Sequence, residues 1–233
     1  MKINLGDLFK GFTQRVAPID PSRFNDELAK RVSWEPLERG GSNMQTHKAV
    51  QIGANRIEFQ MTAIAKFFPL VLAISVFGFF IGLTIKEFYS GNFADVDLKA
   101  FFLPGAIIGF FTIIMLISIL ARKAIIFDRN YGYYWKGKKL KEGEAVNPAD
   151  FKGAVRLSEI KALQIIPEWV VKNSGKHTST YYSYELNLIL ESAQRVNVLD
   201  HGNLPALQED ARVLSEFLGI PIWDASDAAE KRI

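Results

Sequence analysis

Cysteine is absent from this chain of 233 residues, and the absence excludes whole classes of site. Without thiols there can be no disulfide bond, no thiolate nucleophile and no metal site built on sulfur. The three histidines, at positions 47, 177 and 201, have no partner at metal-ligand spacing and form no H-E-x-x-H motif. We therefore expect no metal and no other cofactor.

Catalytic motifs and strong charge are missing as well. The sequence contains no G-x-S-x-G, no G-x-G-x-x-G and no phosphate loop after the glycine pair at positions 40 and 41. The net charge of +3 is too small to indicate a nucleic-acid partner. Asp200, His201, Gly202 and Asn203 form the densest polar cluster, which is either the place of an acid–base pair or a turn that caps the following helix. We expect the protein not to be an enzyme.

Two long apolar runs are present instead, at residues 67–85 and 101–121, and neither contains a charged side chain. As helices they would be about 28–32 Å long, close to the thickness of the hydrocarbon core of a bilayer. Inside lipid the backbone must satisfy its own hydrogen bonds, which favours helices. Residues 64–123 are therefore expected to form a transmembrane hairpin.

Charge on either side of the runs predicts their orientation. The connecting loop, residues 86–100, holds two lysines and three acidic residues, whereas Lys66, Arg122 and Lys123 flank the hairpin on its other side. Basic flanks remain in the cytoplasm. No apolar core of a cleavable signal peptide lies within residues 1–17. We expect a bacterial inner-membrane protein with both termini in the cytoplasm.

Paired glycines lie within each run, as G-x-x-x-G motifs at Gly78 and Gly82 and at Gly105 and Gly109. Small residues four apart share one helix face and let helices approach closely, within the hairpin or against another membrane subunit. The alternative is that glycine is simply common in membrane helices. Neither run contains an ionisable residue, as a transport site would need, so the runs indicate an anchor.

A cluster of basic residues follows the second run and is the candidate contact with lipid headgroups. Its alternative is ordinary positive-inside flanking together with a solvated hairpin tip. Nearby aromatic side chains could lie at the membrane interface or on the core face of two strands. The basic residues are Arg122, Lys123, Arg129, Lys136, Lys138, Lys139 and Lys141, and the aromatic ones are Tyr131, Tyr133, Tyr134 and Trp135.

The N-terminal third is expected to be helical and then extended. Residues 1–33 carry an amphipathic pattern from Leu5 to Val16, which suits a helix in the headgroup region or one packed on a domain or partner. A second short helix is predicted at 23–32. Residues 34–63 read as a loop followed by a strand pair, at about 47–52 and 56–61, with a tight turn between them.

Residues 124–224 are predicted to form a mainly β domain. Strand, turn and strand are expected around Asn130, a further strand over 157–172 with a bulge or edge position at Pro167, and a polar loop over 173–180. Residues 181–190 alternate as a strand, and 195–199 form a short last strand. A helix follows at 204–219, ended by Gly219, and residues 225–233 form a tail.

This order resembles the pleckstrin-homology-like (PH-like) domains of bacterial membrane proteins. The resemblance is carried by the segments IIFDRNYGYYWKG, LSEIKALQII, YYSYELNLIL and ALQEDARVLSEFLG. It implies a membrane α+β fold, with a mainly antiparallel, PH-like cytoplasmic domain that a C-terminal helix closes, next to a two-helix transmembrane hairpin. The strand pair before the hairpin departs from the family pattern and would make the domain discontinuous, with the hairpin inserted in it.

These features together predict a non-catalytic accessory, assembly or regulatory subunit of the inner membrane. Its expected partners are membrane lipids and a membrane-protein partner or complex, bound through the cytoplasmic domain and the helices. Alternatives are an immunity-type protein that neutralises a membrane-acting toxin, a module that senses anionic lipid, and a membrane enzyme that uses Asp200 and His201.

Overall fold

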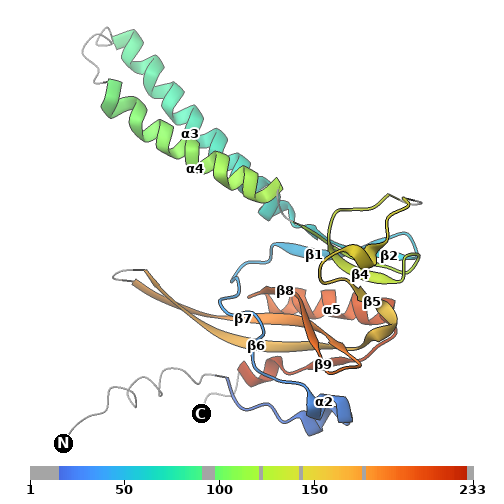
Figure 1. Ribbon diagram of the computed structural model, residues 1–233. Coiled ribbons are helices and arrows are strands. Elements are labelled where there is room, and N and C mark those ends of the chain that lie inside the picture. The colour runs from blue at the N-terminus through green and yellow to red at the C-terminus, as the bar shows by residue number, and fades with distance from the viewer. Residues whose placement is uncertain (1–15, 91–97, 121–122, 142–143, 175–176, 230–233) are drawn as a thin grey trace, which may run out of the picture. The chain divides into compact units, whose positions relative to one another are not determined.

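The computed structural model describes residues 16–90, 98–120, 123–141, 144–174 and 177–229 (Figure 1). The predicted amphipathic segment of residues 1–15 and the last residues of the tail lie outside these ranges. The chain divides into two compact units: Met61–Lys123 forms one, and Met1–Gln60 together with Ala124–Ile233 forms the other.

The first of these units is helical. α3 spans Ala63–Ser90, and the Thr62 hydroxyl accepts a hydrogen bond from the Ala65 amide at its start. The helix is longer than the apolar run, because it continues through the polar residues that follow. It is long and apolar enough to cross a membrane, with a mean hydropathy of 2.4 and only 6% of the spanning window buried. α4 spans Leu98–Leu120, and its described apolar part is Gly105–Met115.

The other unit contains two sheets. The first has the strand order β1 (His47–Ile52), β2 (Arg56–Met61), β3 (Ala124–Asp128), β4 (Tyr133–Gly137) and β5 (Val155–Arg156). β2, β3, β4 and β5 pair antiparallel with their neighbours. The first two strands lie where the sequence predicted them, and β3 and β4 flank the predicted turn.

The second sheet has the order β8 (Arg195–His201), β7 (His177–Leu190), β6 (Ile160–Ser174) and β9 (Ile222–Asp224). The sequence-based prediction of a loop over 173–180 was wrong for its described residues, because 173–174 belong to β6 and 177–180 belong to β7, in a ladder that ends at Ser174 and His177. β9 was not predicted and pairs in parallel with β6. The register shift of β6 lies near Ile160, so Pro167 is not at a bulge. The alternative of an edge position fits Pro167, because no described strand pairs with β6 there on the side away from β7.

The main core lies between the sheets, where α5 (Leu204–Leu218) packs against β1, β6 and β7 (Figure 1). The Asn203 side chain caps the start of the helix, and Gly219 ends it in the left-handed conformation that glycine adopts readily, as predicted. The predicted apolar face of β7, from Tyr184 to Leu188, points into this core. The chain is therefore α+β with mostly antiparallel sheets.

A smaller cluster covers the outer face of the second sheet. Instead of one helix over 23–32, the chain forms the 3₁₀-helix η1 (Pro21–Phe24) and the short helix α2 (Glu27–Arg31). Asn25 has a φ of 50°, which interrupts the helix, and Asp20 and Asp26 cap the two pieces separately. The rings of Phe24 and Trp34 stack at 4.8 Å, and both approach Trp223 of β9.

The loop after β4, with the 3₁₀-helix η3 (Pro148–Asp150), covers the outer face of the first sheet. Trp135 is fully buried there and stacks on Phe151, while Tyr134 points into the main core. Of the two readings of the aromatic group, the core position is correct for Tyr134 and Trp135. Two further 3₁₀-helices lie at Leu157–Glu159 (η4) and Ser226–Ala229 (η5).

Candidate functional site

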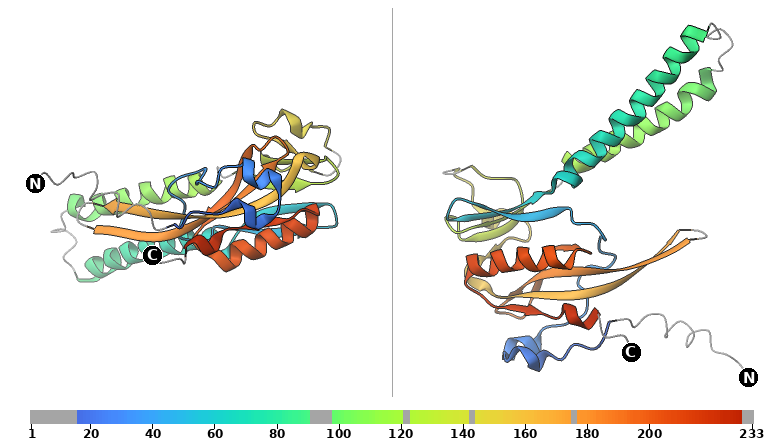
Figure 2. Two further views of the ribbon diagram at one scale, coloured as in Figure 1. Left: turned by 90° about the horizontal axis from the view of Figure 1, so that it is seen from below. Right: turned by 180° about the vertical axis from the view of Figure 1, so that it is seen from behind.

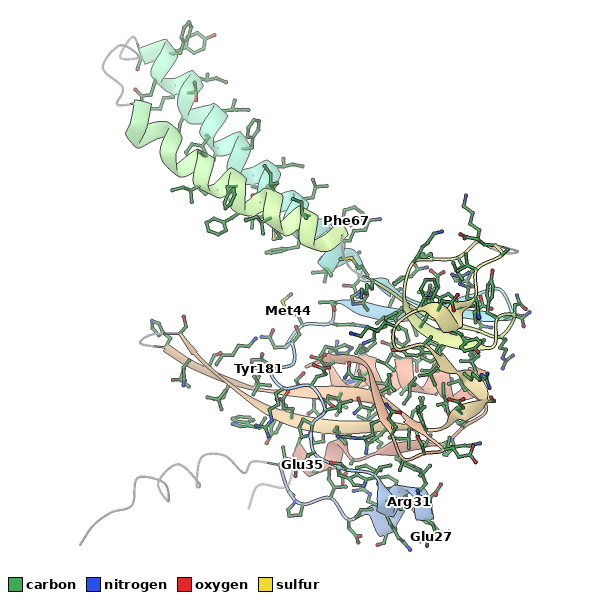
Figure 3. The ribbon with its side chains drawn as sticks, in the orientation of Figure 1. Glu27, Arg31, Glu35, Met44, Phe67 and Tyr181 are labelled. Atoms are coloured by element: carbon green, nitrogen blue, oxygen red, sulfur yellow. The ribbon has the colours of Figure 1, made fainter. Side chains whose placement is uncertain are left out.

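Residues 33–43, which we call the strap, cross the outer face of the second sheet in an extended, irregular conformation (Figure 3). Their amides donate to carboxylates that the strands present. Glu185 of β7 accepts from the amides of Leu37 and Glu38 at 2.9 and 2.6 Å, and Glu168 of β6 accepts from Gly40 at 2.8 Å. The carboxylates thus accept the amide hydrogen bonds that a neighbouring strand would otherwise accept from the strap.

Side chains of the sheet also donate to carbonyl groups of the strap. The Tyr181 hydroxyl donates to the Gly41 carbonyl at 2.7 Å, and the Ser183 hydroxyl donates to the Ser42 carbonyl at 3.1 Å. Arg195 donates to the Glu35 carbonyl at 2.7 Å. The amides and the carbonyl groups of the strap therefore both find hydrogen-bond partners among side chains on one face of the sheet.

Burial governs the electrostatics beneath the strap. Glu185 is 0% exposed, and its burial raises its pKa, although hydrogen bonds from Asn187 and from the strap amides oppose the rise. Burial lowers the pKa of Arg195, against the attraction of Glu185 and Glu35. A buried carboxylate is tolerated here because it accepts three hydrogen bonds.

A surface pocket of about 650 Å³ opens between the strap, the segment before η1 and β6. Trp34 and Trp169 contribute aromatic surface to it, and Glu35 and Arg39 contribute charges of opposite sign. Its other lining residues are Val16, Ala17, Pro18, Ile19, Pro36, Pro167 and Val171, with Glu168 as a further polar group. The exposed surface of the pocket is more polar than apolar, so it suits a segment that presents polar as well as apolar groups.

Next to this pocket, β6 and β7 extend beyond the rest of their sheet as a two-stranded ribbon (Figure 2). We call its described residues, 169–174 and 177–182, the arm. The backbone ladder pairs Val171 with Thr180 and Ser174 with His177. At the base of the arm, the rings of Trp169 and Tyr182 meet edge to face at 4.7 Å. The arm is therefore an ordered and largely exposed projection of the domain.

The predicted basic cluster is only partly a free surface. Lys138 pairs with Glu144 at 2.5 Å, and Lys139 pairs with Glu58. Arg129 lies over the ring of Phe217 and donates to the Phe217 carbonyl at the end of α5. These three basic residues therefore have partners within the chain, although the Lys138 and Lys139 side chains stay exposed.

The other members of the basic cluster lie apart from these pairs. Lys136 is half-buried, and its burial lowers its pKa, against the attraction of Glu38 and Asp200. Lys141 is exposed on the loop after β4, and Lys123 is exposed at the end of the helical unit. Arg122 lies outside the described residues. The contact of this cluster with lipid headgroups stays a prediction.

Three of the predicted packing glycines line a groove of about 980 Å³ between α3 and α4. A Cβ atom added to Gly78, Gly82 or Gly109 would meet nothing within 4 Å, whereas one added to Gly105 would touch the Phe80 ring at 3.7 Å. Within the helical unit, only Gly105 therefore lies in a contact between the two helices. Gly82 does not line the groove.

Asp200 and His201 do not form an acid–base pair, because neighbouring strand residues point to opposite faces. The Asp200 carboxylate accepts from the Ser42 amide at 3.1 Å, on the strap side. His201 is 1% exposed on the other side, opposite Tyr184, and burial lowers its pKa. Among the described residues neither ring nitrogen of His201 has a hydrogen-bond partner.

No group of three or more His, Cys, Asp or Glu side chains in the described part of the chain is placed to hold a metal ion. The strap, pocket and arm were not foreseen as a site. The alternation of Tyr181, Ser183, Glu185 and Asn187 did mark a polar face of β7, but the pattern alone does not show what covers that face.

No protein-family model matches the chain, and no curated protein sequence matches it. The candidate site is therefore defined by its own geometry.

Proposed function

We propose that the chain is a non-catalytic accessory, assembly or regulatory subunit of the bacterial inner membrane that binds a protein partner through its cytoplasmic domain and its membrane helices. The arm carries this proposal, because it is an exposed strand pair beside an aromatic pocket. Surfaces of this kind recognise extended protein segments. α3 supports the membrane location, since the chain covers so little of its apolar surface.

The finer architecture belongs to the same proposal. α3 and α4 would cross the membrane as a hairpin, with both termini in the cytoplasm, and the surrounding domain would be PH-like. Two packed sheets closed by α5 support that likeness. The strand pair before the hairpin and the parallel strand β9 depart from the simple pattern.

The test uses single-cysteine variants, which are clean because the sequence contains no cysteine. Ser179→Cys places a photocrosslinker on the arm, and Glu216→Cys places the same group on the exposed face of α5 as a matched control. In native membranes we expect one defined crosslinked partner from position 179 and none from 216. The same partner should copurify with the unmodified chain in mild detergent.

Two outcomes would contradict the proposal. One is a monodisperse chain without partners after extraction from native membranes. The other is the same set of crosslinked products from both positions, which would show random collisions in place of a specific surface.

A further inference from the structure

The outer edge of β6 is the edge that faces away from β7. β9 pairs with the first part of this edge. The Leu163 amide donates to the Pro221 carbonyl at 2.9 Å, and the Ala225 amide donates to the Ile165 carbonyl at 2.9 Å. Backbone groups along a strand alternate in direction. No register shift is found beyond Ala162, so the odd-numbered residues after Ile165 also turn their backbone groups toward this edge.

Pro167 is the first of these odd-numbered residues, and it has no amide hydrogen to leave unpaired. Beyond it, Val171 and Asn173 direct an N–H and a C=O outward. Within the described ranges no strand pairs with this edge after Ile165. η5 also packs against β6, so the exposed part of this edge begins at Val171, which is 49% exposed, and continues through residues 172–174. In the described part of the chain no strand lies beside this exposed part, which can serve as a template for another strand.

The pocket beside the strap adjoins this edge, because Trp169 and Val171 line it together with Trp34 and Pro36. A strand laid along the edge would place alternate side chains toward the pocket and away from it. The pocket can then receive one of these side chains, while the backbone ladder holds the segment in register.

The charge of the arm indicates which kind of segment it would bind. The described residues of the arm include no aspartate or glutamate, and Lys172 is exposed there. The nearby acids Glu35 and Glu168 line the adjoining pocket instead, and Glu168 accepts hydrogen bonds from amides of the strap. The Lys172 ammonium lies 5.3 Å from the centre of the Tyr181 ring, which fixes the cation close to the strand. An approaching segment with acidic side chains would meet complementary charge here.

We infer that the outer edge of β6, along residues 169–174, receives an extended acidic segment of a partner protein as an added β-strand. The inference rests on the proposed function and specifies how that partner is held. An anionic lipid surface would meet Lys172 equally well but would make no use of an ordered row of backbone groups, so the open edge favours a protein segment.

The test measures binding of short, capped, fluorescent peptides to the full chain in detergent by anisotropy. One peptide alternates valine and glutamate, a second has lysine in place of glutamate, and a third carries proline at its centre. Only the first should bind. Val171→Pro removes one outward amide and leaves the β6–β7 ladder intact, so it should weaken binding by up to about tenfold.

Controls separate this mode from simple attraction of charge. Val171→Thr keeps the amide and should bind as the wild type does, whereas Lys172→Glu should weaken binding without touching the edge. The inference fails if all three peptides bind alike, if none binds, or if anionic vesicles bind in a Lys172-dependent manner while the peptides do not. Failure here leaves the crosslinked and copurified partner of the proposed function as a separate result.

Discussion

Gly41 lies very close to the side chains of the sheet. A Cβ atom added there would clash with the Ser183 side chain and lie 2.7 Å from an Asp200 oxygen. At Gly137 an added Cβ would meet only the Trp135 ring edge, at 3.7 Å.

Gly41→Ala should therefore lower the free energy of unfolding by about 1–3 kcal/mol, as overpacking does, whereas Gly137→Ala should change it far less. All four tryptophans lie outside residues 61–123, so denaturant unfolding followed by their fluorescence reports on the β-containing unit. Equal effects of the two variants would show that the strap is not held in this close contact.

Asp210 of α5 gives a prediction about pH. Burial raises its pKa from 3.8 to about 6, although the Ala49 amide donates to it at 2.8 Å. The folded state thus holds the Asp210 proton more tightly than the unfolded state does. The resulting stabilisation is fully present below about pH 4 and is lost as the pH rises through 6.

Asp210→Asn cannot lose a proton, so its stability relative to the wild type should increase between pH 4 and pH 8 by on the order of 2–3 kcal/mol. Glu216→Gln, on the exposed side of the same helix, is the control, because Glu216 is not among the charges that shift the pKa of Asp210. It should change the dependence of stability on pH far less than Asp210→Asn does. Unfolding curves at several pH values, followed by tryptophan fluorescence, measure the free energy of unfolding of each variant relative to the wild type.

At the scale of elements, the strap depends on carboxylates that belong to the sheet. Glu185→Ala would leave the amides of Leu37 and Glu38 without their acceptors, and each unsatisfied group costs about 1–3 kcal/mol when buried. The strap should then open more often, and trypsin should cleave faster after the exposed Arg39.

Glu191→Ala is the matched control for the strap, because Glu191 makes an exposed ion pair with Lys161 at 3.4 Å. It should leave the rate of cleavage after Arg39 unchanged. An unchanged rate in Glu185→Ala as well would show that other contacts hold the strap.

The two strands of the arm show why one element was misread from the sequence. Residues such as Asn173, Ser174 and Thr178 are polar, and a polar run between two apolar ones reads as a loop. A two-stranded ribbon that is solvated on both faces needs no apolar alternation, because neither face is buried. The polar residues there indicate exposure to solvent, and they do not distinguish a loop from an exposed strand.

At the scale of the whole molecule, the proposed topology makes a prediction about access. If the helical unit spans the inner membrane with both termini in the cytoplasm, a cysteine at Asn92 lies outside and one at Lys176 lies inside. In outer-membrane-permeabilised cells, an impermeant thiol reagent should label Asn92→Cys and spare Lys176→Cys until the inner membrane is disrupted. The reverse pattern of labelling would invert the topology.

The sequence alone determined the local elements, because their signals are local. Alternation gave β1, β2 and β7, the caps at Asn203 and Gly219 gave α5, and the uncharged run gave α3. Only the tertiary structure decided what covers each surface. It placed the strap on the polar face of β7 and β9 beside β6. It also paired Lys138 and Lys139 with acidic residues of the same chain. Such contacts join residues far apart along the chain, so they depend on which faces meet, and no periodicity within one segment encodes that choice.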